Sequence, residues 1–132
     1  MTVAVAHQVS ATARIALVQA IQEARYRQTD LAVLHVVDSA LDADTEESYR
    51  LGVSDEIERA VGADGDLIWK LHLRTVKGDV GDAIVDLTNT MQPDLLVLGA
   101  RRRSPVGKAL MGSVAQTIIL EANVPVLVVK TA

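Results

Sequence analysis

Short runs of apolar residues, separated by longer stretches with helical spacing, form the dominant pattern of this chain. The runs VAVA at 3–6, LAVLHVV at 31–37, DLLVLG at 94–99 and VPVLVV at 124–129 are near-continuous and rich in Val and Leu. Polar or turn residues bound each run, as is typical of strands that are buried on both faces. The pattern therefore predicts four buried parallel strands.

Residues 69–76 follow a different rule, because Trp69, Leu71 and Leu73 alternate with polar side chains. A period of two predicts a strand with one face in water, which suits the edge of a sheet. Four stretches between the strands predict helices at 13–28, 44–62, 82–91 and 113–122. The second of these is the most polar.

Three of the predicted helices carry an apolar stripe. The stripe of 13–28 consists of Ile15, Val18, Ile21 and Tyr26, with Ser10 or Thr12 as N-cap. The stripe of 82–91 consists of Ala83, Ile84, Leu87 and Met91, with Asp79 or Asp82 near the positive helix start. The stripe of 113–122 consists of Val114, Ile118, Ile119 and Ala122.

Strand and helix alternate strictly along the chain. With right-handed crossovers, this order predicts a doubly wound α/β fold, in which a five-stranded parallel sheet has helices on both faces. A length of 132 residues and a hydrophobic fraction of 49% fit one domain, which we expect to span residues 1–132. The absence of Phe makes that core aliphatic.

Composition narrows the chemistry. The chain has no cysteine, which excludes disulfides, thiolate metal sites and cysteine nucleophiles. Its three histidines, His7, His35 and His72, have no spacing that places two on one helical face, so we expect no metal site. We expect His35 to be satisfied inside the fold and His7 to lie exposed in a loop.

Charge and hydropathy exclude further classes of partner. The formal net charge is −4, which disfavours binding of nucleic acid or membrane surfaces through overall electrostatics. No apolar stretch approaches 18 residues, and the N-terminal residues lack the layout of a secretory signal. We therefore expect a cytoplasmic protein with neither nucleic acid nor membrane as partner.

The most informative stretch joins the strand at 94–99 to the helix at 113–122. It contains Gly99, the cations Arg101, Arg102, Arg103 and Lys108, and then Gly112 and Ser113 at the helix start. Glycine allows close approach of backbone to ligand, and a helix N-terminus offers unpaired N–H groups, so phosphate is the natural guest. The alternative is that the glycines only make turns and the cations only solvate the loop.

Two common nucleotide motifs do not fit. A Walker A loop needs four residues between its glycine and Gly-Lys, whereas seven separate Gly99 from Gly107, and Ala109 stands where a hydroxyl should bind magnesium. A dinucleotide fingerprint after the first strand is also excluded, because residues 3–12 contain no glycine.

The combined pattern resembles the universal stress protein family. Gly99, the pair Gly112 and Ser113, and the run VPVLVV fall at the places of that family's ATP-binding signature. VLHVV at 33–37 and GDVGDAI at 78–84 extend the resemblance over essentially the whole chain. Two departures stand out: Arg102 occupies the place of the second loop glycine, and Ala6 occupies the place of an acidic residue.

The resemblance implies a Rossmann-like fold of the adenine-nucleotide alpha-hydrolase type, with strand order 3-2-1-4-5. It also implies binding of ATP or AMP, with Mg²⁺, by the residues at positions that match the family's site. Those positions are Ala4, Ala6, Val36, Gly99, Arg101, Arg102, Arg103, Gly112, Ser113 and Val114. Ala4 and Val36 would flank the base, and the glycines, arginines and Ser113 would hold phosphates.

The resemblance further implies a homodimer through the last strand, formed by Val124, Val126, Leu127, Val128 and Val129. The leading functional hypothesis is an adenine-nucleotide-binding stress-response protein without substantial catalysis, at most a slow ATP hydrolase. The alternative is a dimeric interaction or signalling module that has lost nucleotide binding, as Ala6 and Arg102 suggest. Enzymatic turnover has the least support, because no nucleophile, base and orienting group can be assembled from the motifs.

Overall fold

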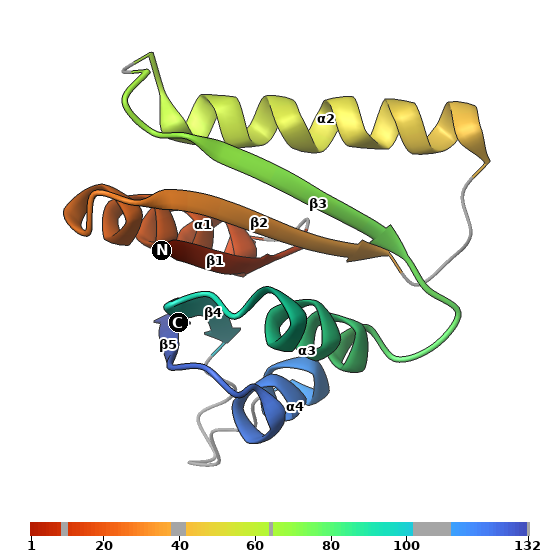
Figure 1. Ribbon diagram of the computed structural model, residues 1–132. Coiled ribbons are helices and arrows are strands. Elements are labelled where there is room, and N and C mark those ends of the chain that lie inside the picture. The colour runs from red at the N-terminus through yellow and green to blue at the C-terminus, as the bar shows by residue number, and fades with distance from the viewer. Residues whose placement is uncertain (9–10, 38–41, 64, 102–111, 132) are drawn as a thin grey trace.

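The computed structural model describes residues 1–8, 11–37, 42–63, 65–101 and 112–131, and these form strands and helices in alternation (Figure 1). The strands are β1 (Thr2–His7), β2 (Asp30–Val37), β3 (Trp69–Thr75), β4 (Leu95–Arg101) and β5 (Val126–Thr131). The helices are α1 (Ala11–Tyr26), α2 (Ala43–Val61), α3 (Val80–Met91) and α4 (Ser113–Glu121). Every predicted boundary agrees with the structure within two residues.

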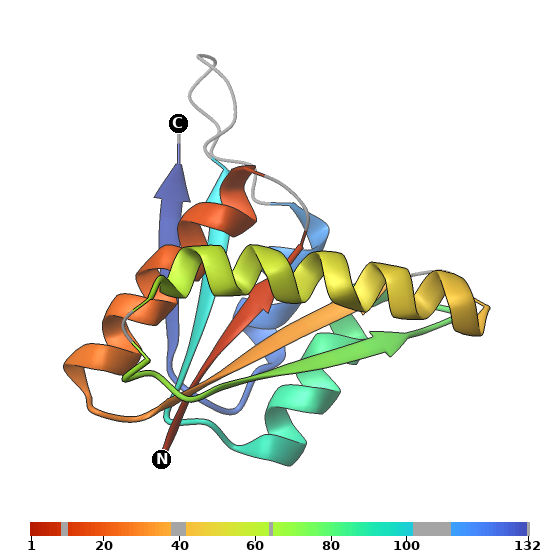
Figure 2. The same ribbon diagram turned by 90° about the horizontal axis from the view of Figure 1, so that it is seen from above.

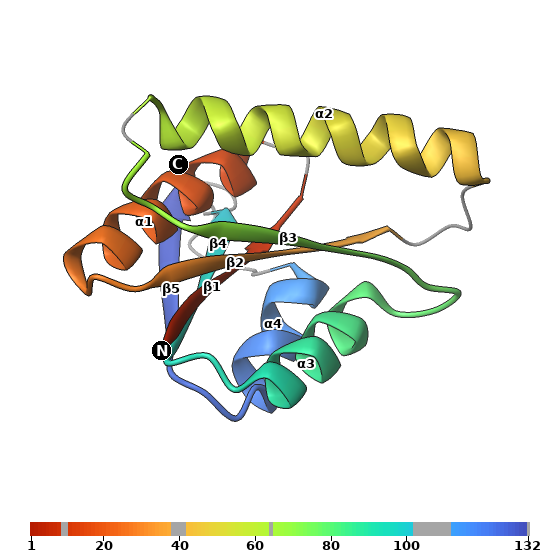
Figure 3. The same ribbon diagram turned by 45° about the horizontal axis from the view of Figure 1, so that its top comes forward.

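The strands form one parallel sheet in the order β3-β2-β1-β4-β5, which confirms the predicted doubly wound fold. Figure 3 shows α1 and α2 on one face of the sheet and α3 and α4 on the other. Because β1 lies in the centre, the chain winds outward first through β2 and β3 and then through β4 and β5. The winding direction thus reverses between β1 and β4.

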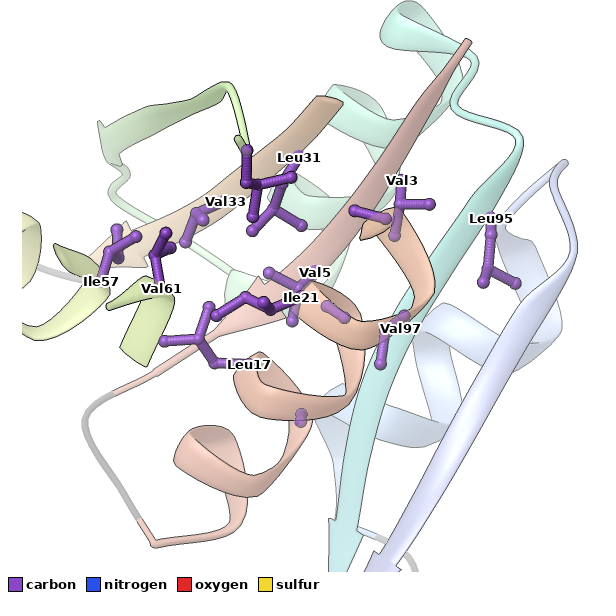
Figure 4. Close-up of a cluster of buried hydrophobic side chains, with 14 of the residues drawn as sticks. Val3, Val5, Leu17, Ile21, Leu31, Val33, Ile57, Val61, Leu95 and Val97 are labelled. Carbon is purple, nitrogen blue, oxygen red and sulfur yellow. The ribbon is translucent and has the colours of Figure 1, made fainter. Parts of the chain in front are cut away.

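The face under α1 and α2 has a core of Val and Leu side chains from the sheet and small residues from α1 (Figure 4). The predicted stripe of α1 is confirmed only at Ile21, because Ile15, Val18 and Tyr26 are 47%, 44% and 89% exposed. The buried residues of the helix are Ala13, Ala16, Leu17, Ala20, Ile21 and Ala24. Four of those six are alanine, whose small side chain lets a helix lie close to a sheet.

Helix α2 completes this face. It packs through Val53, Ile57 and Val61, and Figure 2 shows it lying crosswise over the sheet. Trp69 of β3 packs into the same core.

The opposite face is built on α3 and α4, with a core that includes Ile84 and Ile118. Their stripes are confirmed in part, since Ile84 and Ile118 are buried while Ile119 is 37% exposed. Gly81 lets the two helices approach, because a Cβ there would lie 3.1 Å from the Cβ of Thr117.

The edges of the sheet are β3 and β5. In β3, Leu73 is buried while Lys70 and Arg74 are exposed, as the alternating pattern predicts. Among the residues described, none of the helices combines the length and the apolar composition that crossing a membrane would require.

Candidate functional site

The reversal of winding lies between β1 and β4, and in open parallel sheets ligands bind outside the carboxyl ends of the strands at such a point. Ala6 and Leu98 face each other in the register of these two strands. Both residues belong to the core on the α3 and α4 face. The first residues of α4 follow β4 in the chain and pack against the same core through Val114.

Helix α4 begins without a side-chain cap. Its N-cap is Gly112, the described residues supply no capping side chain, and no acidic residue lies in the first turn. Ser113 is the first helical residue and is exposed. The unpaired N–H groups of this first turn carry the positive end of the helix dipole.

Two other helices, in contrast, have an acidic N-cap side chain. In α2 the carboxylate of Asp42 accepts a hydrogen bond of 2.7 Å from the backbone N–H of Thr45. In α3 the carboxylate of Asp79 accepts a 3.0 Å hydrogen bond from the N–H of Asp82, which confirms the predicted acidic start. These helix starts have a carboxylate partner from the protein, whereas none of the described residues provides one for the start of α4, and an anion suits such a helix start.

Four of the predicted nucleotide residues gather on the α4 side of the sheet. Ala4, Ala6 and Val36 are buried in the core of that face, and half-buried Val114 packs against it. Gly112 is exposed, and a Cβ placed on it would meet nothing within 4 Å. Small side chains of the sheet and the first turn of α4 therefore lie on the same face of the sheet.

Gly99 has a different role from the one expected of a phosphate-loop glycine. A Cβ at this position would lie 2.7 Å from the carbonyl oxygen of Thr12 and 3.3 Å from the Cβ of Ala16. The vacant side of Gly99 therefore faces α1, on the face of the sheet opposite Ala6 and Val114. This glycine is needed so that α1 can pack against β4.

The basic residues are only partly placed. Arg101 is the last residue of β4 and lies opposite Thr131 in the register with β5. Arg102, Arg103 and Lys108 lie outside the described residues.

A second group of polar residues lies on the other face of the sheet. His7 ends β1, pairs with His35 of β2 in the strand register and is 0% exposed. The prediction of an exposed loop position for His7 is wrong, because β1 continues through residue 7. The prediction for His35 is confirmed, since it is buried and hydrogen-bonded through both ring nitrogens.

Contacts extend this histidine pair to the surface. The Nδ1 atoms of His7 and His35 lie 2.9 Å apart, and Nε2 of His35 lies 2.8 Å from Oη of Tyr49. Nε2 of His7 lies 3.5 Å from Oε1 of Glu56, which in turn lies 3.7 Å from Nε of exposed Arg14. The sequence reasoning missed Tyr49 and Glu56, although their spacing of seven places them on one face of a helix.

Burial controls the titration of this group. Burial, with a smaller contribution from the neighbouring His7, lowers the pKa of His35 to about 4 against the opposing pull of Glu56. Burial also lowers the pKa of His7, although Glu56 opposes the effect. Burial raises the pKa of Tyr49, and Glu56 adds to this shift. Both imidazoles and the phenol are therefore uncharged near neutral pH.

A third feature is a hollow of about 640 Å³ at the amino ends of the strands, lined in part by Met1, Arg25 and Ile68. Arg25 is already occupied there, since it donates to the carbonyl of Val61 and lies 3.6 Å from Asp66. Within the part of the chain that the structure describes, no group of three or more His, Asp or Glu side chains could hold a metal ion. The carboxyl edge of the sheet is therefore the better candidate site.

The chain is similar to known proteins over nearly its whole length. A family model described as the universal stress protein family matches residues 1–130. A universal stress protein of Mycolicibacterium smegmatis is 35% identical over 120 residues, which make up 89% of this chain and 88% of that protein.

Two solved structures are similar over nearly their whole length. A universal stress protein from Archaeoglobus fulgidus in complex with dAMP has a TM-score of 0.69 at 25% identity, covering 96% of this chain and 94% of its own. A universal stress protein in complex with cAMP has a TM-score of 0.69 at 25% identity, covering 100% of this chain and 98% of its own.

Proposed function

This chain belongs to the universal stress protein family, and from that premise we propose that it binds an adenine nucleotide, ATP or AMP, at the carboxyl edge of its sheet. The observation that carries the proposal is the start of α4. Its first turn follows Gly112 without a side-chain cap from the described residues, on the face of the sheet where Ala6 and Val36 are buried. Phosphate satisfies the N–H groups of such a turn and complements the helix dipole.

The relatives support adenine as the base, because the two similar structures are complexes with dAMP and cAMP. In this chain Ala4 and Val36 would flank the base, and Gly112, Ser113 and Val114 would meet the phosphates. Arg101, Arg102 and Arg103 would add cationic donors to the phosphate oxygens. Gly99 would contribute only indirectly, by holding α1 against β4.

In this proposal Mg²⁺ would bind only together with the nucleotide. Among the described residues expected at the site, Ser113 has the only polar side chain that the structure places, and Ala6 supplies no carboxylate. Mg²⁺ prefers oxygen ligands and usually shares them with substrate phosphates. The ion would therefore be held by phosphate oxygens, with Ser113 as a single protein hydroxyl beside them.

We further propose that the protein is a nucleotide-binding stress-response protein of the cytoplasm without substantial catalysis. The described residues around the start of α4 supply no general base beside Ser113 that would activate it as a nucleophile. Binding without turnover fits a protein whose response follows the level of nucleotide.

The test compares two substitutions of exposed glycine by aspartate. Gly112→Asp adds a carboxylate that caps α4 and repels phosphate, whereas Gly65→Asp adds the same charge near the amino ends of the strands. We expect millimolar AMP or ATP to raise the melting temperature of the wild type and of Gly65→Asp, as ligand binding to the native state requires. We expect at least about tenfold weaker binding in Gly112→Asp, measured by calorimetry.

Adenosine and inorganic phosphate serve as partial ligands in the same experiment. Protection by phosphate alone would identify an anion site without base recognition. Unchanged melting of the wild type at millimolar nucleotide would refute the proposal. It would favour the alternative, an interaction module that has lost nucleotide binding.

We also propose a homodimer through the β5 edge. Val126, Leu127, Val128 and Val129 are only half-buried in a strand that pairs, within the described sheet, with β4 alone. An apolar edge of this kind needs a cover. Native mass spectrometry tests the proposal, since a monomer at micromolar concentration would contradict it.

A further inference from the structure

The chain of polar contacts from Tyr49 to Glu56 has no part in the proposed nucleotide site. It lies between the sheet and α2, on the face opposite Ala6 and Val114. His7 and His35 are 0% and 2% exposed, and buried polar groups of this kind are expensive unless each has a partner. The arrangement therefore needs an explanation of its own.

One proton must lie between the two imidazoles, because two nitrogen lone pairs cannot share a contact of 2.9 Å. If His7 supplied that proton through Nδ1, its Nε2 would be a lone pair facing the carboxylate of Glu56 at 3.5 Å. Two acceptors would then face each other. The neutral pair is satisfied in the opposite sense, with Nδ1–H of His35 donating to Nδ1 of His7.

This choice orders the whole chain in one direction. The hydroxyl of Tyr49 donates to Nε2 of His35, His35 donates to His7, and Nε2–H of His7 points its proton toward Glu56. Nε2 of His7 and Oε1 of Glu56 are buried and form no hydrogen bond with the described residues, so Nε2 of His7 has only the 3.5 Å contact with this carboxylate. Each member of the chain therefore depends on the next.

The ordered pair can accept one proton with its contacts preserved. A proton added to Nε2 of His35 turns the hydroxyl of Tyr49 from donor to acceptor, and the bond between the imidazoles is unchanged. A second proton would place an N–H on both Nδ1 atoms. Two donors and two positive charges would then face each other, and the contact between His7 and His35 would break.

Helix α2 depends on these contacts for part of its attachment. Its apolar contacts come from Val53, Ile57 and Val61, while Tyr49 and Glu56 supply its polar contacts to the two strands. The opposite side of the helix is solvent-facing, with Leu51 62% exposed. Opening of the histidine pair would leave the amino-terminal half of α2 with little that holds it down.

We propose that Tyr49, His35, His7 and Glu56 form an acid-sensitive latch that holds α2 on the sheet and releases it when both imidazoles become protonated. The charged and titratable groups facing the pair come from every element around it. They are His7 of β1, His35 of β2, Tyr49 and Glu56 of α2, and Arg14 of α1.

The direction of the pH effect follows from the histidines. Their pKa values are lowered in the folded protein and return to about 6.5 when α2 opens and water reaches them. The open state then binds more protons than the closed state, so closure weakens as pH falls from about 6.5 toward 4. Between about pH 7 and pH 9 the histidines and the Tyr49 phenol are neutral in both states, so the latch contributes no pH dependence there.

Hydrogen exchange of the native protein tests the latch. After correction for intrinsic exchange rates, we expect protection of the α2 amides to fall at least about tenfold more than protection of the α3 amides between pH 7 and pH 5. Parallel losses in the two helices would overturn the proposal.

Two substitutions sharpen this experiment. His7→Asn leaves an amide oxygen that accepts from Nδ1–H of His35 but removes one titrating ring, so we expect most of the extra loss in α2 to disappear. His72→Asn is the matched control, because the pKa of His72 is also lowered by burial but its charged neighbours are Lys70 and Arg74. This control should keep the wild-type response, and an equal effect of the two substitutions would overturn the latch.

A measurement on the wild type needs no variant. Nitrogen-15 NMR of the histidine side chains should show a scalar coupling across the N–H···N bond at pH 7.5, with His35 as the Nδ1–H tautomer and His7 as the Nε2–H tautomer. Loss of that coupling should accompany the loss of α2 protection on acidification. Two Nε2–H tautomers without coupling would refute the arrangement.

Discussion

The two faces of the sheet solve the problem of covering a parallel sheet in different ways. The α3 and α4 face is almost entirely apolar, and its buried Thr88 donates to the carbonyl of Ile84 one turn earlier in the same helix. The α1 and α2 face combines an aliphatic core with a polar chain whose links come from different elements. The buried hydroxyl of the α3 and α4 face finds its hydrogen-bond partner within its own helix. The buried polar groups of the α1 and α2 face find theirs only when β1, β2 and α2 are assembled.

This difference indicates which face of the sheet responds to a change in pH. A face held by apolar contacts responds little to pH, because burial of hydrocarbon does not depend on proton concentration. A face whose contacts include titratable rings responds directly. The proposed ligand site lies on the first kind of face, so nucleotide binding and acid response would be separable properties of one sheet.

The largest effects should come from removing a core side chain on each face. Ile57 of α2 and Ile118 of α4 are both 0% exposed. We expect Ile57→Ala and Ile118→Ala each to lower the free energy of unfolding by about 3 to 4 kcal/mol, through lost burial and the remaining cavity. Urea denaturation at pH 7.5 measures both. A cost below about 1 kcal/mol for Ile57→Ala would show that α2 is held mainly by its polar contacts.

Intermediate changes in the free energy of unfolding should come from the two glycines at which neighbouring elements pack closely. A Cβ at Gly99 would meet the backbone of Thr12 at 2.7 Å, whereas a Cβ at Gly81 would meet side-chain atoms of Asp79 and Thr117 at 3.0 and 3.1 Å. We expect Gly99→Ala to cost about 2 kcal/mol, because the backbone of α1 must shift. Gly81→Ala should cost less than about 1 kcal/mol, since side chains can adjust and alanine favours the helix.

The same denaturation experiment contains its own control. The Cβ added by Gly112→Ala would meet nothing within 4 Å. This substitution should therefore change the free energy of unfolding by less than about 0.5 kcal/mol. Equal costs at Gly99 and Gly112 would mean that α1 does not lie against β4 as the structure has it.

The smallest changes in the free energy of unfolding should come from removing one hydroxyl group on each face of the sheet. Tyr49→Phe removes the hydroxyl that donates to Nε2 of His35 and leaves that nitrogen without its partner, so we expect a cost of about 1 to 2 kcal/mol. Thr88→Val removes a hydroxyl whose partner, the carbonyl of Ile84, remains within the helix, so we expect a change within about 0.5 kcal/mol. Thermal and urea unfolding at pH 7.5 measure both, and a larger cost for Thr88→Val would reverse the comparison.

The order and bounds of the elements were predictable from the sequence because strands buried on both faces are recorded as local runs of Val and Leu. The winding rules then supply the parallel sheet. The buried face of α1 was not predictable in the same way. Ala16, Ala20 and Ala24 compete with Ile15 and Val18 for the inner face, and ranking side chains by size favours the wrong side when the helix must lie close to the sheet.

The candidate site was predictable where it depends on a motif, and not where it depends on strand register. Gly112 and Ser113 at the start of α4 follow from the spacing of the glycines and the helical stripe. The pairing of His7 with His35 follows only when β1 and β2 are aligned, which brings together residues 28 positions apart. The true role of Gly99 likewise required the position of Thr12 in space.

The alignment of His7 with His35 also bears on how the sheet finds its correct pairing. Sliding β2 by one residue along β1 would place His7 opposite Leu34 or Val36. Both imidazoles would then be buried against apolar side chains without a hydrogen-bond partner. Strands as uniformly aliphatic as these offer few other penalties for such an error. The contact between the two histidines therefore favours the observed register of β1 and β2 over either neighbouring register.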